Sequence, residues 1–562
     1  MSTAQQSTAA DQLTLRVLGA LLREDVLGLR TRSTAEERPD GRWLRLGPLA
    51  LPVRADGFQS ELTARLPLLT VRDLPVTGLP AILAELAELA DPQDRDGYRG
   101  FAEECRQTLA TMELHADVRG QVHDLLALRH GNHPADWTGP AASLAFDTLA
   151  AFLDHPVYPT ARGRSGLSED ELRRYAPEFH PSFALNWLAV PVGALAVDTA
   201  SPRPHWWPTL EQLGLGHLST THLAFPVHPL STADALAAAP GSVLAEVAYL
   251  EVVPTLSMRT VALAEHPEWH LKLPLATATL GLRNRRTIKP GTLEDGAAGQ
   301  RLFEAVLARE PRLAERILHA DEQGYAHTGH ELLAVLTRRY PAGLEDAVTV
   351  PLAALLAPAP GGLVIDLLAE RYHGGSVTAL YRELLTLLLD WQTTLFGYGI
   401  ALESHQQNTS LVLDRVDGAT RLRLLYKDND GPRVNTARLG ELRSFVGEFD
   451  DARVFSESDL ALTDLFTTIT GHLCTASLAF GLAAHGRAPL AELLGLLRAE
   501  LERSIGRLGP VGDPLRAALL DAERLPVKAM VTAGSLLSKE RSGAADINKH
   551  YTSGPNYLRL EA

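Results

Sequence analysis

The clearest pattern along the chain is a pair of apolar, β-type runs separated by two turn residues. The runs cover residues 410–416 and 420–426, and an Asp-Gly pair at 417–418 is followed by one more residue before the second run. Asp-Gly between two such runs predicts a β-hairpin with a two-residue turn.

A dense set of polar residues surrounds the open end of this hairpin. An extended backbone before the first run would point Glu403, His405 and Gln407 to one side, because side chains alternate along a strand. If the residues flanking the turn pair with each other, Gln407 lies opposite Asp428. Carboxylates, an imidazole and amides would then meet in a set suited to a hard cation and its phosphate. A solvated strand end with polar loop residues explains the pattern equally well.

Periodicity elsewhere predicts both helices and strands. The apolar spacing predicts helices over residues 11–29, 80–129 with a break near 91–92, 301–395, 459–501 and part of 515–537. β-rich runs predict strands at residues 43–53, 223–228, 245–253, 269–275 and 277–282. The turn-rich residues 358–362 indicate a domain boundary.

Composition narrows the class of protein. With 562 residues, the chain is too long for one ordinary domain, and its 45% hydrophobic and 22% charged residues are typical of globular proteins. The net charge is −15 and the Lys and Arg residues are scattered, so we expect no nucleic-acid partner.

Cysteine usage and the chain start bear on location. Cys105 and Cys474 are the only cysteines, which argues against a disulfide framework and against a thiolate metal site. Residues 1–11 are polar and lack the apolar core of a signal peptide, and no uninterrupted apolar run is long enough to span a bilayer. We expect a cytoplasmic protein with no membrane partner.

Two basic regions are candidates for anion binding. Residues 155–166 combine prolines, glycines and the side chains of His155, Arg162 and Arg164, which suits a fixed loop that holds an anion. A plain inter-domain loop is the alternative, and composition alone favours it.

The second basic region runs through a series of predicted strands. Ser257 and Arg259 follow one strand, Lys272 lies within another, and Arg283 follows a third. Together they would form a basic concave surface for phosphate. Exposed charges on an antiparallel sheet are the alternative.

The order of these motifs is specific as a set. In chain order they are His155-Pro156 with Arg162 and Arg164, His228-Pro229, Ser257-Met258-Arg259-Thr260, Lys272, Glu403 to Asn408, Lys427-Asp428 and Lys528. The set, over about residues 145–535, resembles the siderophore synthetases that work without a nonribosomal peptide synthetase, the aerobactin-synthetase (IucA/IucC-like) family.

The resemblance implies an α+β fold with an open-hand architecture. Its three parts would be a mostly helical thumb at residues 1–145, fingers with an antiparallel sheet at 146–360, and a mixed α/β palm with the hairpin and the C-terminal helices at 361–562. Homodimers are common in the family, so a homodimer is implied as well.

The resemblance also implies a reaction. ATP and Mg²⁺ would activate a carboxylic acid, typically citrate or a related derivative, as an acyl-adenylate. An amine or hydroxylamine would then attack to give an amide, and AMP and pyrophosphate would be released. This agrees with the residues, since joining two anions requires positive charge and metal.

The resemblance assigns roles to individual residues. Ser257, Arg259, Thr260 and Lys272 would hold the phosphates, with His155, Arg162 and Arg164 also on the nucleotide side. His405 and Arg283 would contact the substrate carboxylate, with Lys272 as a further catalytic group. Glu403, Asn408 and Asp428 would bind Mg²⁺, and Gln407, Asn408 and Asp428 the nucleotide.

The 155–166 loop departs from the family pattern. Tyr158 stands where the family usually has a second histidine, and Arg162 stands at its lysine position. Tyr is a weaker base and Arg has a different geometry, so we expect a changed contact to the nucleotide or the acid.

Two other functions compete. His-x-x-Asn with an Asp about twenty residues later loosely resembles small-molecule phosphotransferases, but there is no Gly-rich phosphate loop, and Gln407 occupies the position of the kinase Asp. A non-catalytic binding protein is the other alternative. The joint presence of Arg259, Lys272, Glu403, His405 and Asp428 argues against it.

Overall fold

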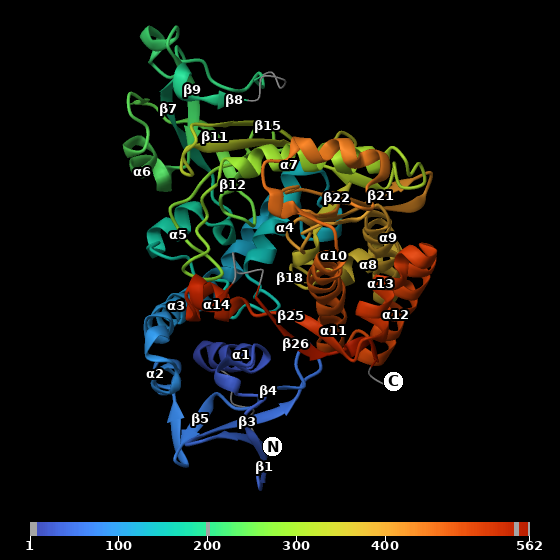
Figure 1. Ribbon diagram of the computed structural model, residues 1–562. Coiled ribbons are helices and arrows are strands. Elements are labelled where there is room, and N and C mark those ends of the chain that lie inside the picture. Colours follow the sequence, from blue (N-terminus) through green and yellow to red (C-terminus); the bar gives the residue numbers. More distant parts are fainter. Residues whose placement is uncertain (1–7, 198–202, 544–549, 560–562) are drawn as a thin grey trace.

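The protein is described here by a computed structural model that covers residues 8–197, 203–543 and 550–559. Helices and sheets are mixed throughout, which confirms the α+β expectation. In Figure 1 the N-terminal part lies at the bottom, a large sheet rises at the upper left, and helices from the C-terminal half pack at the right. The open-hand arrangement and its boundaries at 145 and 360 stay predictions.

The N-terminal part combines helices with a sheet. Its helices are α1 (Ala9–Arg23), α2 (Leu79–Leu89) and α3 (Arg95–His130), which confirms the predicted helices and the break between α2 and α3. Its six-stranded sheet consists of β1 (Thr34–Arg38), β2 (Gly41–Leu46), β3 (Leu49–Ala55), β4 (Leu62–Ala64), β5 (Leu68–Val71) and β6 (Leu74–Thr77). The prediction for this part missed β1 and β4 to β6, and β4 to β6 have only three or four residues, which is too short to show an alternating pattern.

The large sheet has nine strands, and every pairing in it is antiparallel, as predicted. The strands are β7 (Phe183–Pro191), β8 (Ala196–Val197), β9 (His222–Val227), β10 (Val243–Leu244), β11 (Tyr249–Pro254), β12 (Thr260–Leu263), β13 (Trp269–Lys272), β15 (Asp321–His327) and β16 (Ala334–Arg339). Residues 277–282, predicted as a strand, form a loop.

The predicted hairpin is present with the predicted register. Strands β21 (Thr409–Val416) and β22 (Ala419–Tyr426) pair so that Val416 faces Ala419. Asp417 and Gly418 have φ angles of 52° and 82°, the left-handed pair that a two-residue hairpin turn requires. With β14 (Ile317–His319) and β17 (Val348–Pro351) the hairpin forms a four-stranded sheet.

Residues 301–395, predicted as helical, contain several strands. Helices α7 (Gly291–Leu307), α8 (Val364–His373) and α9 (Val377–Gly397) are present, but β14 to β17 and a small hairpin of β18 (Pro358–Ala359) and β19 (Gly362–Leu363) lie between them. Short apolar runs do not distinguish a buried strand from a buried helix, which explains the error.

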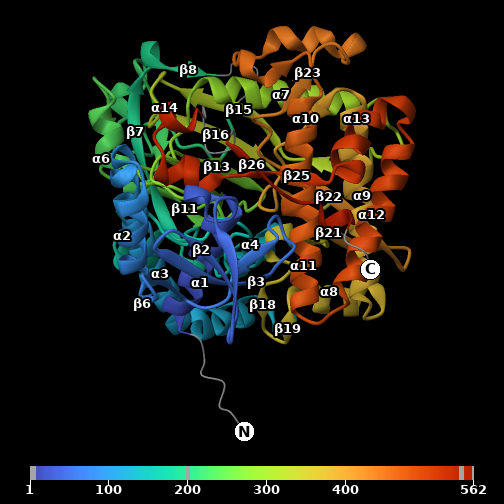
Figure 2. The same cartoon turned by 60° about the horizontal axis from the view of Figure 1, so that its bottom comes forward.

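Helices of the C-terminal half surround the hairpin sheet in Figure 2. They include α10 (Leu460–Leu465), α11 (Ser477–Ala484) and α12 (Leu490–Gly506), and a π-helix at Phe466–Ala476 joins α10 to α11. By length and composition Leu460–Ala484 could cross a membrane, which the sequence pattern did not indicate, but 83% of its apolar window is buried inside the molecule.

The remaining elements complete the chain. They are α4 (Gly139–Ala151), α5 (Glu169–Tyr175), α6 (Thr232–Ala237), β20 (Ile400–Ala401), β23 (Arg433–Asn435), β24 (Phe455–Ser456), α13 (Asp513–Arg516), β25 (Arg524–Lys528), α14 (Lys539–Ser542) and β26 (Tyr551–Pro555). The largest apolar core runs from Leu13 in α1 to Leu558, so the N-terminal part and the C-terminal helices share one core.

Candidate active site

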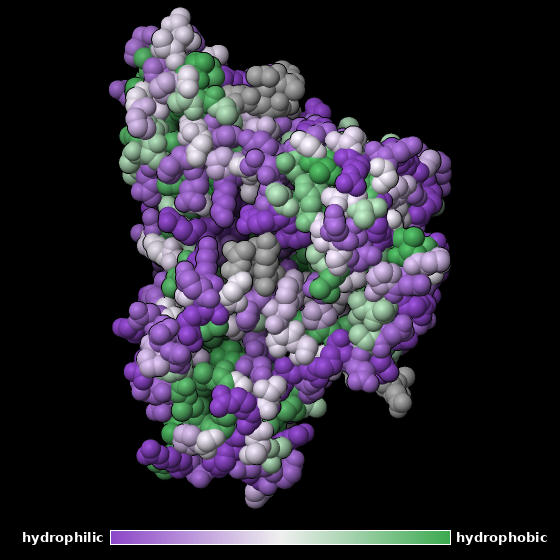
Figure 3. Space-filling model, in the orientation of Figure 1, coloured by the Kyte–Doolittle hydropathy of each residue, from purple (hydrophilic) through white to green (hydrophobic). Residues whose placement is uncertain are grey.

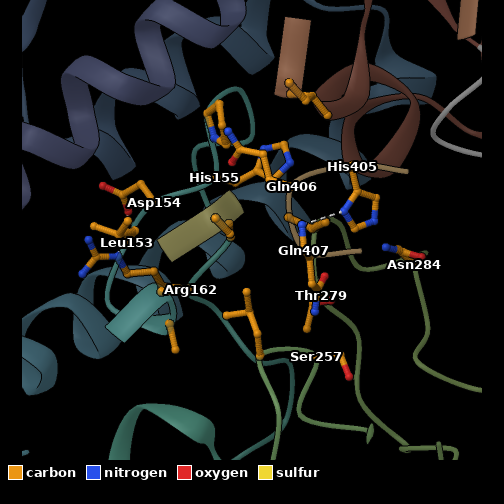
Figure 4. A pocket seen from close by; sticks show the side chains of 18 of the residues that line it. Leu153, Asp154, His155, Arg162, Ser257, Thr279, Asn284, His405, Gln406 and Gln407 are labelled. Atoms are coloured by element: carbon orange, nitrogen blue, oxygen red, sulfur yellow. Dashed lines mark hydrogen bonds and ion pairs between the residues drawn. The ribbon is translucent and has the colours of Figure 1, made fainter. Parts of the chain in front are cut away.

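The predicted motifs meet around one cavity of about 340 Å³, which is a typical size for a small-molecule site. Loops, element ends and a π-helix from six parts of the chain line it, at residues 150–164, 256–259, 279–286, 403–428 and 469–530 and at Ala353 (Figure 4). Hydrophilic residues dominate the middle of the molecular face between the N-terminal part and the large sheet (Figure 3).

The segment before the hairpin supplies four lining residues, Glu403, His405, Gln406 and Gln407, but not as a strand. β20 ends at Ala401, and the backbone N–H groups of Asn408 and Thr409 donate to the carbonyl of His405 at 2.9 and 3.2 Å, which closes a turn. The predicted extended backbone was therefore wrong. Glu403, His405 and Gln407 nevertheless all line the cavity, because the turn presents them to the same side.

His405 is the central imidazole of the site. Burial lowers the pKa of His405, although Glu403 and Asp428 oppose that shift. Its ring is therefore neutral near pH 7. Asn408 lies behind it, with Nδ2 at 3.4 Å from His405 Nε2, and does not line the cavity.

Asp428 lies at the other strand of the open hairpin end. Its φ of 66° is in the left-handed region, which is uncommon for a residue other than Gly and is concentrated at functional sites. Lys272 Nζ donates to its carboxylate, and Arg338 Nη2 lies 3.6 Å away. Burial raises the pKa of Asp428, but Lys272 and Arg338 outweigh it, so the carboxyl is ionised with a pKa well below its ordinary value.

Lys272 reaches the cavity only through Asp428. It is buried, and its Nζ also lies 3.7 Å from Asp430 Oδ2. Thr260 pairs with it across β12 and β13 and is likewise buried outside the cavity lining. Lys272 and Thr260, which were predicted to bind phosphate, therefore lie behind the part of the cavity wall that Ser257 and Arg259 form.

The cavity wall carries more positive than negative side chains. Arg162, Arg164, Arg259, Arg286 and Lys528 line it, against Asp154, Glu403 and Asp428. Burial and the neighbouring Arg259 lower the pKa of Arg286 to about 9, so it is still charged at neutral pH. Such an excess of cations suits a ligand with several negative charges.

The structure does not bring Arg283 into this wall. Arg283 is exposed and its Nη1 lies 3.5 Å from the carbonyl of Ala533, whereas Arg286 lies in the cavity lining. The 279–286 segment is a loop in which Arg286 N–H donates to the carbonyl of Thr277 at 2.9 Å. A reversing loop, in place of the predicted strand, turns a different arginine inward.

All three candidates from the 155–166 loop line the cavity. His155 Nδ1 accepts from the backbone N–H groups of Val157 and Tyr158 at 3.2 and 3.0 Å, and burial lowers the pKa of His155 to about 3. Arg162 Nε donates to Asp154 at 2.7 Å. The loop is therefore a fixed, cationic part of the cavity wall and not a plain linker.

Tyr158, in contrast, points away from the cavity. Its side chain is fully buried and its hydroxyl donates to Glu104 Oε2 at 3.1 Å, while the backbone N–H of Tyr158 is the group that faces His155. The expected change in nucleotide or acid contact from Tyr158 therefore has no geometric basis in the structure.

Lys528 and an apolar wall complete the site. Lys528 ends β25, so the predicted helix over 515–537 is interrupted by a strand, and its Nζ lies 3.6 Å from Glu403 Oε1. Ile469 and Leu473 of the π-helix and Met530 form the apolar side. Sequence reasoning missed these residues because apolar residues in a helical pattern look like ordinary core.

The predicted Mg²⁺ ligands are only partly assembled. Glu403 and Asp428 line the cavity, but each faces a lysine, and Asn408 does not line it. Within residues 8–197, 203–543 and 550–559 no group of three or more His, Cys, Asp and Glu side chains is arranged to hold a metal. Two carboxylates fit Mg²⁺ only when substrate phosphates supply further oxygen ligands.

Comparisons with known proteins bear on identity. The chain matches the model of the IucA / IucC family over residues 143–357 and that of the ferric iron reductase FhuF-like transporter over residues 382–541. Aerobactin synthase of Escherichia coli is 26% identical over 406 residues, which are 65% of this chain and 67% of that protein. Staphyloferrin A synthase of Staphylococcus aureus is 24% identical over 344 residues, 55% of this chain and 56% of that protein.

A solved structure gives the same fold. ATP-bound aerobactin synthetase IucA of Klebsiella pneumoniae superposes with a TM-score of 0.69 at 19% identity, over 98% of this chain and 100% of that chain. The sequence matches, and the ordered motifs that meet at the cavity, support the resemblance of this chain to the siderophore synthetases of the IucA/IucC family.

Proposed function

We propose that the protein is an ATP-dependent amide synthetase of siderophore biosynthesis, which adenylates a carboxylic acid and condenses it with an amine or hydroxylamine. The observation that carries the proposal is the cavity in which Arg164, Arg259, Arg286 and Lys528 surround the neutral His405. The names of the relatives, which are siderophore synthases, and the ATP bound to the Klebsiella structure support it.

In the first step, an oxygen of the substrate carboxylate attacks the α-phosphorus of ATP. The new O–P bond gives the acyl-adenylate, and the bond between the α-phosphorus and the bridging oxygen to the β-phosphate breaks to release pyrophosphate. Both reactants are anions, so Arg259 and Arg286 would lower the barrier by offsetting the charge that accumulates between them.

His405 would orient the acid in this step. A neutral imidazole can donate one hydrogen bond to a carboxylate without fixing it as a tight ion pair. Arg286 would be the charged partner of His405, in the role that the family resemblance had implied for Arg283. His155 and Arg164 complete the same wall and would bind a further negative group of the acid or the nucleotide.

In the second step, the nitrogen of the amine or hydroxylamine attacks the acyl carbon. The C–N bond forms, the bond from carbon to the AMP oxygen breaks, and the nitrogen loses a proton to solvent. Citrate or a related polycarboxylate stays the predicted acid, because the cavity has several cations to satisfy. The homodimer and the cytoplasmic location also stay predictions.

Glu403 and Asp428 are the residues that would hold Mg²⁺ together with the phosphates. When bound, the metal ion would supply positive charge at the phosphate oxygens. Lys272 donates to the same Asp428 carboxylate, so Lys272 and the metal ion would compete for its oxygens.

The deciding experiment is ATP–pyrophosphate exchange over a panel of carboxylic acids. Exchange that depends on one acid, with AMP formed when an amine is added, supports the proposal. The competing phosphotransferase would give ADP and a phosphorylated acid without exchange. That result would overturn the proposal.

A further inference from the structure

Two carboxylates of the N-terminal part lie outside the cavity but bond to the loops that form it. Glu104 on α3 is buried and accepts hydrogen bonds from the hydroxyls of Tyr158 and Thr160, each at 3.1 Å. It also accepts from the backbone N–H of Leu282 at 3.1 Å and from the hydroxyl of Ser535. One side chain therefore joins three segments that are far apart in the sequence.

Each of those segments continues into the cavity wall. The first segment carries His155 and Arg162, the second lies between Thr279 and Arg286, and the third follows Lys528 and Met530. Glu104 thus sits where the three walls of the site meet behind the lining residues.

Glu24, at the end of α1, repeats the arrangement on the third segment. It is buried and accepts from the backbone N–H groups of Val531 and Thr532 at 3.0 and 2.8 Å and from the Thr532 hydroxyl at 2.8 Å. On the same helix, Arg16 donates to the carbonyl of His155 at 2.9 Å. Helix α1 therefore holds both the His155 segment and the segment after Lys528.

Glycines bring these backbones into close contact. A Cβ added to Gly97 on α3 would lie 2.0 Å from the carbonyl oxygen of Leu536, and one on Gly281 would lie 2.9 Å from that of Gly534. One on Gly163 would lie 2.9 Å from Thr108 Oγ1 of α3. The three segments are packed on α3 and on one another without room for a side chain.

Buried carboxylates are an expensive way to stabilise a fold. Removing an ionised carboxylate from water costs several kcal/mol unless its oxygens are hydrogen-bonded, and apolar residues of similar volume often stabilise a core at least as well. Directional bonds to three loops do something that an apolar contact does not, because they fix the loops relative to one another.

We propose that Glu104 and Glu24 are positioning residues, which hold the three loops of the cavity in the arrangement that binds acid and nucleotide. The binding part of this inference rests on the proposed function. Neither residue lines the cavity, so neither touches substrate, and both act through the backbone of the loops that do.

The test compares Glu104→Gln with Glu103→Gln by hydrogen exchange followed by mass spectrometry. Gln keeps the shape of Glu104 but replaces one acceptor oxygen with an NH2 group, so some of the four groups that donate to Glu104 lose their acceptor. Glu103 is the matched control, because it is the preceding residue of the same helix and pairs with Arg106 on the exposed face. Exchange in residues 155–165 and 531–538 is expected to be about tenfold faster in Glu104→Gln and unchanged in Glu103→Gln.

A second readout links the loops to binding. The KM for the acid in pyrophosphate exchange is expected to rise about tenfold in Glu104→Gln, with a smaller change in kcat. If Glu104→Gln does not fold, Tyr158→Phe and Ser535→Ala each remove one hydrogen bond to Glu104. Both variants are expected to speed hydrogen exchange in residues 155–165 and 531–538.

The outcomes separate this inference from the proposed function. A lower melting temperature with parental exchange in both segments would mean that Glu104 only stabilises the fold, and would overturn the inference. In another outcome the parent activates no acid, while hydrogen exchange in the two segments is still faster in Glu104→Gln and unchanged in Glu103→Gln. In that case the proposed function fails, and the role of Glu104 in holding the loops stands.

Discussion

The two ends of the β21–β22 hairpin carry similar charges but differ in where the partners come from. At the turn end, Asp414 pairs with Arg421 at 2.6 Å and Arg423 at 2.7 Å, both on the facing strand. At the open end, Asp428 meets Lys272 on β13 and Arg338 on β16, which belong to the large sheet. One cluster is made by hairpin register, and the other only by the tertiary fold.

Cavity size does not distinguish the two ends. A cavity of about 350 Å³ lies beside the turn end, close in volume to the 340 Å³ of the site. Its lining balances Arg371, Arg415 and Arg421 against Glu345, Asp346 and Asp414. The open end instead has an excess of cations and two half-buried histidines of lowered pKa. Unbalanced, buried charge from distant elements marks a site better than volume does.

The strongest test of this comparison replaces one carboxylate at each end. Asp428→Asn is expected to lower acid-dependent pyrophosphate exchange by about 1,000-fold, because it removes both the proposed metal ligand and the partner of Lys272. Asp414→Asn is expected to keep the rate of pyrophosphate exchange within about twofold of the parent and to lower the melting temperature. Exchange rates and thermal melts of both variants check this. Equal activity losses would erase the distinction between the ends.

A second test removes the imidazole of His405 at the open end. His405→Ala is expected to lower the rate of adenylate formation about 100-fold, because the acid loses its orienting donor. ATP affinity, measured by calorimetry, should change far less. If adenylate still forms at the parental rate and only the amine-dependent step slows, His405 serves the acceptor instead of the acid.

A third test separates the arginine that the sequence indicated from the one that the fold selects. Arg286→Gln is expected to weaken acid binding by about 10- to 100-fold, the effect of losing one charge-assisted hydrogen bond. Arg283→Gln should have no effect, because Arg283 is exposed outside the cavity lining. Titration of both variants with the carboxylic acid that supports pyrophosphate exchange in the parent measures this. A larger loss in Arg283→Gln would place the acid elsewhere.

The residues in those three tests differ in how far the sequence could predict their positions. The hairpin and its register follow from local rules, since Asp417 and Gly418 accept the left-handed angles of a tight turn. The approach of Lys272 to Asp428 needs β13 and β22 to be placed by tertiary packing, and the family resemblance implied only that both residues act on the metal–nucleotide complex. Arg286 was missed because one loop reversal decides which of several arginines turns inward.

Other residues of the site have positions that no local sequence pattern indicates. Ile469 and Leu473 look like core in any helical pattern, and Tyr158 looks like a substituted active-site residue until its hydroxyl is placed on Glu104. The helical prediction for 301–395 failed between α7 and α8 for a related reason, since strands of two to seven residues are too short to show a clear period. Local chemistry thus predicted the polar end of the hairpin, and packing decided the rest.

The smallest expected effect concerns the pH dependence of stability at the turn end. Burial raises the pKa of Asp414, but Arg421 and Arg423 outweigh it, so its pKa in the folded chain lies below its ordinary value. The pair therefore stabilises the fold above the unfolded pKa of about 3.9, and this contribution is lost as the pH falls through the folded pKa. Between about pH 5 and 3 the parent should lose up to about 1 kcal/mol more stability than Asp414→Asn. Urea denaturation at a series of pH values measures the difference, and parallel curves would show that the Asp414 pairs contribute nothing to folding, so that hairpin register alone gives the turn end its stability.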